Sequence, residues 1–343
     1  MIEKLGKTNS NLCSSLNNLQ EHFDRIRNIP SEQKLIIKNL KKQRLIWKQQ
    51  VDRIEKNFDS AVKKNAGGGA AGVGAGVAVA ALGPTAAMGI ATTFGVASTG
   101  TAISALSGAA ATNAALAWLG GGALAAGGGG MAAGSAFLAL AGPIGWSIAG
   151  AAILASGIAV IVAQQDKKRL ENIFTMIAKR DAKNYALAST EISERIKEVL
   201  SENKLLSDAL SNIESFGLDY IKMDENQQYE LGTYVNLLSS ATSLLINPIL
   251  SLQPKLTESD YVRYLSIMHR EGHPDDYLKN KAIIVYLSNL LFHIKIDRKD
   301  KELLTKSIKS NKELLKSLKC SARGFKLEYL DLAIDAVRFK YVT

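Results

Sequence analysis

The chain has 343 residues, a formal net charge of +10 and an apolar content of 47%, with only 6% aromatic residues. This length is enough for two domains, or for one large domain with an insertion. Two cysteines, Cys13 and Cys320, are too few to build a disulfide framework, which excludes the small disulfide-stabilised class. Residues 1–18 lack the apolar stretch of a signal peptide, so we expect synthesis in a cytoplasm.

Charge and glycine divide the chain into three segments. Residues 65–165 contain no Asp, Glu, Lys, Arg or His, and 23 of the 28 glycines lie between Gly67 and Gly157. Residues 1–64 carry 14 basic and 7 acidic side chains, whereas residues 166–343 carry 28 and 25. We therefore expect a basic N-terminal helical arm over 1–64, a charge-free membrane-inserting region over 65–165 and a C-terminal helical domain over 166–343.

The N-terminal arm shows helical periodicity, because its apolar residues recur at spacings that place them on one helix face. The two stripes are Leu5, Leu12, Leu16, Leu19, Phe23 and Ile26, and then Leu40, Trp47, Val51, Ile54 and Phe58. Pro30 separates them, and Ser31 is a suitable N-cap for the second helix. The other faces of the second helix are rich in Lys and Arg, which indicates, most simply, the solvated face of a bundle helix. A negatively charged partner is the alternative, and of nucleic acid and anionic lipid we favour lipid.

The charge-free region is unlike the core of a soluble domain, in which each surface helix needs a hydrated face. Since about 20 helical residues cross a bilayer core about 30 Å thick, the region could hold up to four crossings. The strongest candidate span is Ile144 to Ala163, and the Ala-, Gly-, Ser- and Thr-rich segments before it are weaker. The residues predicted to contact the membrane or pack within it, in and beside this span, are Pro143, Trp146, Ile153, Ile158 and Ile161.

Basic residues flank the charge-free region on both sides. Lys63 and Lys64 precede it, and Lys167, Lys168 and Arg169 follow it. Positive charge favours the cytoplasmic side of a membrane, so both ends should lie on the same side. The number of crossings should therefore be even.

Glycines recur every fourth residue at the start of this region. Gly68, Gly72 and Gly76 have this spacing, and Gly130 and Gly134 repeat it. Such a face lets two helices approach closely, so helix packing in a membrane is the favoured interpretation. A flexible low-complexity stretch is the alternative. A phosphate-binding loop is rejected because no Lys follows the glycines.

The C-terminal domain again shows helical periodicity and no alternating strand pattern, so the predicted class is all-α. Pro248 and Pro254 mark a break, after which Thr257 and Asp260 are placed to cap a helix. The expected apolar positions and helices are Leu170, Ile173, Ile177, Ile192, Ile196, Val199 and Leu200, then a buried helix over 283–294, an amphipathic segment over 303–318 and a last helix over 325–339.

Candidate sites for chemistry are sparse. His269, Glu271, His273, Asp275 and Asp276 form the only cluster of metal-ligand types, and the end of a surface helix is its simpler explanation. The four histidines offer no arrangement for nucleophilic catalysis. We expect no enzymatic activity, no metal, no cofactor and no small-molecule substrate.

Helical arms around an Ala- and Gly-rich, charge-free hairpin resemble the α-helical pore-forming proteins, namely pore-forming colicins, the membrane-inserting region of apolipoprotein L and two-component helical toxins. The resemblance rests on the composition of residues 66–163, under a third of the chain, which is about twice the length that one hairpin needs. It implies a soluble form that hides the hairpin, a membrane form that releases it, and a homo-oligomer with or without a second helical component.

We therefore expect a toxin or a cell-killing effector that permeabilises a lipid bilayer and does not bind nucleic acid. The alternative is a constitutive membrane-anchored scaffold that oligomerises and binds a partner without conducting ions.

Overall fold

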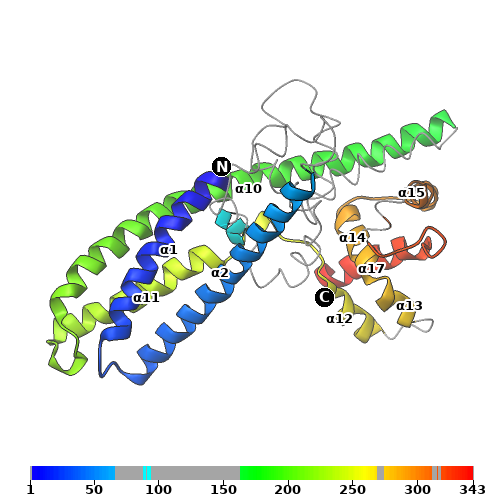
Figure 1. Ribbon diagram of the computed structural model, residues 1–343. Coiled ribbons are helices and arrows are strands. Elements are labelled where there is room, and N and C mark those ends of the chain that lie inside the picture. Colours follow the sequence, from blue (N-terminus) through cyan, green and yellow to red (C-terminus); the bar gives the residue numbers. More distant parts are fainter. Residues whose placement is uncertain are drawn as a thin grey trace. The chain divides into compact units, whose positions relative to one another are not determined.

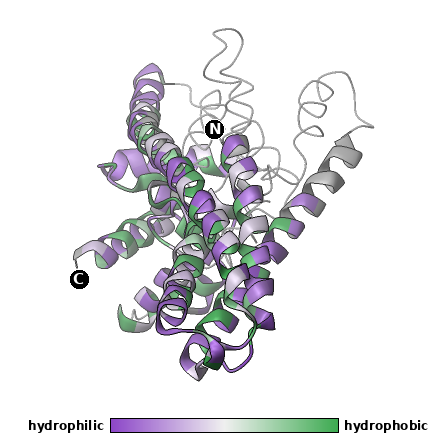
Figure 2. Ribbon diagram, turned by 90° about the vertical axis from the view of Figure 1, so that its left-hand side faces the viewer, coloured by the Kyte–Doolittle hydropathy of each residue, from purple (hydrophilic) through white to green (hydrophobic). Residues whose placement is uncertain are grey.

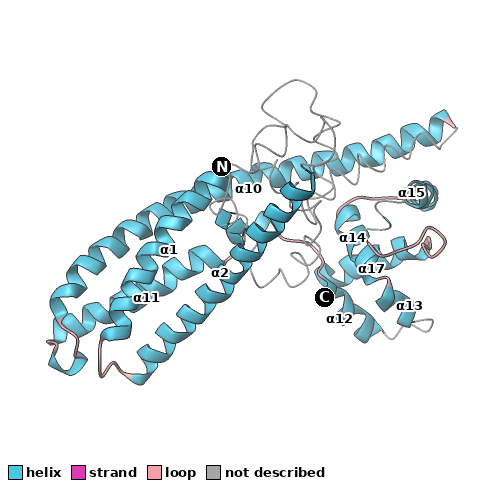
Figure 3. Cartoon of the chain, in the orientation of Figure 1, coloured by secondary structure: helices cyan, strands magenta, loops and turns pink. Residues whose placement is uncertain are grey.

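The computed structural model describes residues 2–65, 88–89, 91–93, 163–268, 274–310, 315 and 318–342, and the regular elements in these ranges are all helices (Figure 1, Figure 3). The predicted all-α class is therefore confirmed. The chain forms two compact units: unit 1 comprises Met1–Thr99 and Leu187–Ser251, and unit 2 comprises Gly100–Ala186 and Leu252–Thr343. Helix α10 (Gln164–Ile213), which is 50 residues long, contributes to both.

Unit 1 is built, in its described part, as a bundle of long helices. Helices α1 (Ile2–Arg25), α2 (Ser31–Asn65) and α11 (Glu225–Ile246) share one hydrophobic core with the C-terminal part of α10 (Figure 1). Two short 3₁₀ helices, η2 (Glu214–Phe216) and η3 (Tyr220–Lys222), connect α10 to α11. In Figure 2 the long helices carry hydrophilic and hydrophobic residues along their length, the pattern that bundle helices need.

The apolar stripes predicted for the N-terminal arm form much of this core. All six residues of the first stripe are buried, and so are Leu40, Trp47 and Val51 of the second. The side chains of Ile54 and Phe58 lie outside the described part of the chain. Both predicted helices are confirmed, with the break at Pro30.

One predicted core position on α10 is wrong. Periodicity places Leu200 on the apolar stripe, but its side chain is 51% exposed. The buried face of α10 in this part of unit 1 runs through Val199, Leu206 and Ile213, which are seven residues apart. Leu200 lies one residue, or about 100° of helix rotation, away from that face.

A charged side chain is buried within unit 1. Arg44 of α2 is only 5% exposed, and it donates hydrogen bonds to Thr242 Oγ1 on α11 at 2.9 Å and to Gln20 Oε1 on α1 at 2.6 Å. Burial lowers the pKa of Arg44, while the hydrogen bonds join three helices through one guanidinium. The predicted solvated face is therefore wrong for Arg44, while the lysines of α2 from Lys34 to Lys48 are exposed. Arg44 lies four residues after Leu40 and three before Trp47, which places it on the buried stripe.

The two connections at one end of unit 1 are joined to each other. The amide of Arg27 donates to the carbonyl of Leu218 at 2.9 Å, and the amide of Tyr220 donates to the carbonyl of Arg27 at 3.0 Å. Asn28 Nδ2 also donates to Asp219 Oδ1 at 2.8 Å. These bonds fix the α1–α2 turn against the α10–α11 connection.

Gly217 in that connection has φ +78° and ψ −173°, a conformation that other residues rarely adopt, and its added Cβ would meet no atom within 4 Å. Gly217→Ala should therefore lower the free energy of unfolding by about 1–3 kcal/mol through backbone strain. Gly232 inside α11 is the matched control, because its Cβ would make an ordinary 3.7 Å contact with Gln33. Gly232→Ala should raise the free energy of unfolding by up to about 1 kcal/mol.

Urea unfolding followed by circular dichroism measures both changes. Equal stability of the Gly217→Ala chain and the parent would contradict the strain assigned to this turn.

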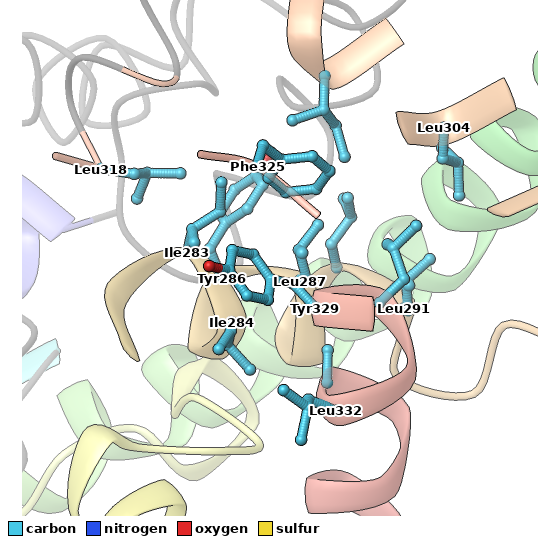
Figure 4. Close-up of a cluster of buried hydrophobic side chains, with 14 of the residues drawn as sticks. Ile283, Ile284, Tyr286, Leu287, Leu291, Leu304, Leu318, Phe325, Tyr329 and Leu332 are labelled. Atoms are coloured by element: carbon cyan, nitrogen blue, oxygen red, sulfur yellow. The ribbon is translucent and has the colours of Figure 1, made fainter. Parts of the chain in front are cut away.

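Unit 2 is organised around α14 (Lys281–Leu291), which packs against α17 (Glu328–Val342), α12 (Glu258–Met268) and α13 (Pro274–Lys279). Helix α15 (Arg298–Ser310) and the first part of α10 supply further core residues. Figure 4 shows the centre of this core, with Ile283, Ile284, Tyr286, Leu287, Leu291, Leu304, Leu318, Phe325, Tyr329 and Leu332 gathered together. The buried helix predicted over 283–294 is thereby confirmed, although it ends at Leu291.

The break predicted near the two prolines is also confirmed, since α11 ends at Ile246 and α12 begins at Glu258. Thr257 and Asp260 cap α12 reciprocally. The Thr257 amide donates to Asp260 Oδ2 at 2.8 Å, and the Asp260 amide donates to Thr257 Oγ1 at 3.1 Å.

Candidate membrane-inserting region and its docking on unit 1

The residues that the sequence assigns to membrane insertion and helix packing lie outside the described part of the chain. They are Gly68, Gly72, Gly76, Gly130, Gly134, Pro143, Trp146, Ile153, Ile158 and Ile161. A hydrophobic hairpin is therefore not shown. Within the ranges that the structure describes, no helix combines the length and the apolar character needed to cross a bilayer.

Besides Asn65 and residues 163–165 at its two ends, one short piece of the charge-free region is described, and this piece lies in unit 1. We call residues 88, 89 and 91–93 the docked segment; all five are helical and buried. Met88 and Ala91 belong to the hydrophobic core of unit 1, and Thr92 and Thr93 are 0% exposed. At least this part of the charge-free region is thus held by the helical bundle.

Asn9 of α1 is the polar partner of the docked segment. Its Nδ2 donates to Thr92 Oγ1 at 2.8 Å, and both side chains are fully buried. A buried amide is costly unless it forms hydrogen bonds, so this bond favours one position of the segment along α1. Asn9 Oδ1 finds no partner among the described residues.

A backbone hydrogen bond provides a second attachment. The amide of Ile249, just after α11, donates to the carbonyl of Thr93 at 2.9 Å. The hydroxyl of Thr93 donates within the segment to the carbonyl of Gly89 at 2.7 Å. The segment is therefore held through a side chain of α1 and through the chain that follows α11.

Sequence analysis misses Asn9 and Thr92, although a signal for Asn9 exists. The first apolar stripe passes from Leu5 to Leu12 in one step of seven, and Asn9 occupies the core position between them. A single polar residue on an apolar stripe often specifies register or partner. Thr92 carries no comparable signal, because Ser and Thr residues are scattered through the charge-free region.

The flanking basic residues differ in their surroundings. Lys63 and Lys64 belong to the last turn of α2, and their side chains are outside the described part. Lys167 and Lys168, at the start of α10, are exposed. Arg169 forms ion pairs with Asp297 and Asp300, and these contacts raise its pKa. Arg169 is thus engaged in the fold of unit 2, and the inference about membrane sidedness rests on the four lysines.

The predicted helix-end explanation of the His and acid cluster is supported only for its last two residues. His269 to His273 lie outside the described part, while Asp275 and Asp276 stand in the first turn of α13. Asp276 accepts hydrogen bonds from Lys326 at 2.8 Å and from the hydroxyl of Tyr329 at 3.0 Å. Across the described residues, no group of three or more His, Cys, Asp or Glu side chains is placed to hold a metal ion.

No family model matches the chain, and comparison with curated proteins and with solved structures likewise gives no match. The structural findings above therefore carry the functional argument together with the sequence.

Proposed function

We propose that this protein inserts its charge-free region into a lipid bilayer and permeabilises or depolarises the membrane, as a pore-forming toxin or a cell-killing effector. The observation that carries the proposal is the run of 101 residues, 65–165, without one ionisable side chain. Such a run can enter hydrocarbon without the cost of burying a charge. The resemblance to α-helical pore-forming proteins points the same way, and we propose no enzymatic activity.

Insertion is proposed to be conditional. The docked segment places part of the charge-free region in the core of unit 1, through one side-chain and one backbone hydrogen bond. Each such bond contributes only about 1 kcal/mol net, and the segment's apolar side chains are few. A membrane that offers a better environment to the whole region could therefore reverse the preference, which requires two states a few kcal/mol apart.

The membrane form is proposed to be a homo-oligomer, with or without a second helical component. The glycine faces at Gly68, Gly72 and Gly76 would let inserted helices approach closely. Lysines at both ends of the region favour an even number of crossings. Membrane association after a trigger completes the proposal.

Vesicle leakage tests this function directly. The docked segment dictates the design of the deletion, because removing all of residues 65–165 would also remove part of the core of unit 1. The variant should instead retain residues 1–99 and replace 100–162 with a Gly- and Ser-rich linker. We expect the parent to release a trapped dye and the variant to release none.

Circular dichroism and urea unfolding establish that the deletion variant keeps its helical units. Equal leakage from parent and variant, or failure of the parent to bind or permeabilise any vesicle, would contradict the proposal. Stable binding by the parent without leakage would favour the membrane-anchored scaffold.

A further inference from the structure

The outward side of α2 combines positive charge with exposed aliphatic side chains. Its buried face carries Ile37, Leu40, Arg44, Trp47 and Val51, and the remaining positions from Ser31 to Gln49 are exposed except Gln33, which is half-buried. Five residues on the exposed side, termed the outer stripe, lie within an arc of about 100° at about 100° per residue. They are Leu35, Lys38, Lys42, Leu45 and Ile46.

The aliphatic members of the outer stripe are substantially open to solvent. Leu35 is 59% exposed, Leu45 57% and Ile46 40%. Single exposed aliphatic residues are ordinary on a protein surface. Three of them within one arc of a single helix, interleaved with lysines, form a surface that is both apolar and cationic.

The charge of the outer stripe is not neutralised within the fold. Lys41 pairs with Asp24, and Lys48 pairs with Asp52 at the next turn of α2. Lys38 and Lys42, which belong to the stripe, form no ion pair with any described residue. The stripe itself contains no acidic residue, so it presents uncompensated positive charge.

We propose that the outer stripe of α2 binds the surface of an anionic lipid bilayer, with the lysines at the headgroups and the aliphatic side chains in the interfacial layer. An amphipathic helix lying in this interface has this composition. Long lysine side chains can reach the headgroups while the aliphatic groups insert. This inference rests on the proposed function, because α2 ends at Asn65, where the charge-free region begins.

Two other occupants fit less well. A second copy of this chain would bring the same lysines against each other, and like charges facing across an interface oppose association. The phosphates of a nucleic acid could accept the lysines, but they offer no apolar layer for the three aliphatic side chains of the stripe. An anionic bilayer matches both the charge and the aliphatic groups.

Co-sedimentation with phosphatidylcholine vesicles, with and without phosphatidylserine, tests the inference. We expect the full chain to bind the anionic vesicles more tightly, and to bind them less at high salt. Replacing Lys38→Gln and Lys42→Gln together should weaken this binding about 25-fold, since each lysine near an anionic surface contributes about fivefold. Leu45→Ser with Ile46→Ser should weaken binding at all salt concentrations.

The matched control removes the same charge from other elements of unit 1. Lys204 on α10 and Lys222 in η3 are also exposed, and Lys204→Gln with Lys222→Gln should leave vesicle binding unchanged. If the control variant loses as much vesicle binding as the Lys38→Gln, Lys42→Gln variant, net charge alone matters. This result would overturn the proposal that the outer stripe binds the bilayer. If the stripe variants keep vesicle binding but lose self-association or duplex DNA binding, the proposed lipid surface is overturned as well.

Binding and leakage are recorded on the same samples, which separates this inference from the proposed function. Stripe-dependent binding without leakage supports the lipid surface and contradicts permeabilisation. If the stripe variants leak like the parent, permeabilisation is supported and the proposal that the outer stripe binds lipid is overturned. Absence of binding to every vesicle overturns both.

Discussion

A covalent bond between positions 9 and 92 should reduce vesicle leakage to background. The side chains of Asn9 and Thr92 are hydrogen-bonded at 2.8 Å in the core of unit 1, so cysteines at both positions could be joined directly or by a short reducible cross-linker. The chain would carry Asn9→Cys and Thr92→Cys, with Cys13→Ser and Cys320→Ser to remove the native thiols. If the charge-free region must leave unit 1 to insert, the oxidised chain cannot permeabilise a membrane.

Reduction of the same chain should restore leakage. Replacing both residues by cysteine removes the Asn9–Thr92 hydrogen bond, which contributes about 1 kcal/mol net. The reduced chain should therefore leak at least as fast as the parent. If undocking limits the leakage rate, the rate should rise by up to about fivefold. Leakage that does not differ between the oxidised and reduced chains would show that docking at this site does not control insertion.

Unit 1 itself supplies a matched control for this experiment. The hydroxyl of Ser15 on α1 donates to Asn203 Oδ1 on α10 at 2.8 Å. A chain with Ser15→Cys and Asn203→Cys would join two bundle helices and leave the docked segment free. We expect it to leak like the parent in both redox states. Loss of leakage in the oxidised control would indicate that the bundle must also open.

The parts of the fold that could be predicted from sequence are those that local periodicity determines. A helix repeats every 3.6 residues, so the stripe from Leu5 to Ile26 specifies both the helix and its buried face. The cap at Thr257 is equally local, because its hydrogen bonds span three residues. For the same reason the boundaries at Pro30 and after Ile246 were predictable.

Contacts between distant segments could not be predicted in this way. Unit 1 joins residues 1–99 to residues 187–251, and no local pattern states which amphipathic face meets which. The burial of Arg44 depends on partners 24 and 198 residues away. The docked segment depends on Asn9, 83 residues before Thr92. The membrane-inserting region therefore remains a prediction from composition, and the attachment of the docked segment to the bundle could not be predicted.

The glycine face should distinguish an assembling membrane region from a plain anchor. Gly72→Leu adds apolar surface, which favours transfer into lipid by about 1–3 kcal/mol for a fully buried leucine. The same side chain fills the groove that close helix contact needs. Hydrophobicity alone therefore predicts equal or greater leakage, whereas helix–helix assembly predicts strongly reduced leakage with membrane binding retained.

Ala71→Leu is the matched control, because on a helix it adds comparable apolar surface about 100° around the axis from Gly72. Overpacking can also disturb the form that precedes insertion, at a cost of about 1–3 kcal/mol, so membrane binding and leakage must be scored separately for each variant. We expect Gly72→Leu and Gly76→Leu to bind vesicles like the parent and to lose leakage, while Ala71→Leu keeps both. If all three variants bind and leak like the parent, the glycines do not form an assembly surface. If the parent itself binds and does not leak, the charge-free region acts as an anchor, and the scaffold becomes the better description of this protein.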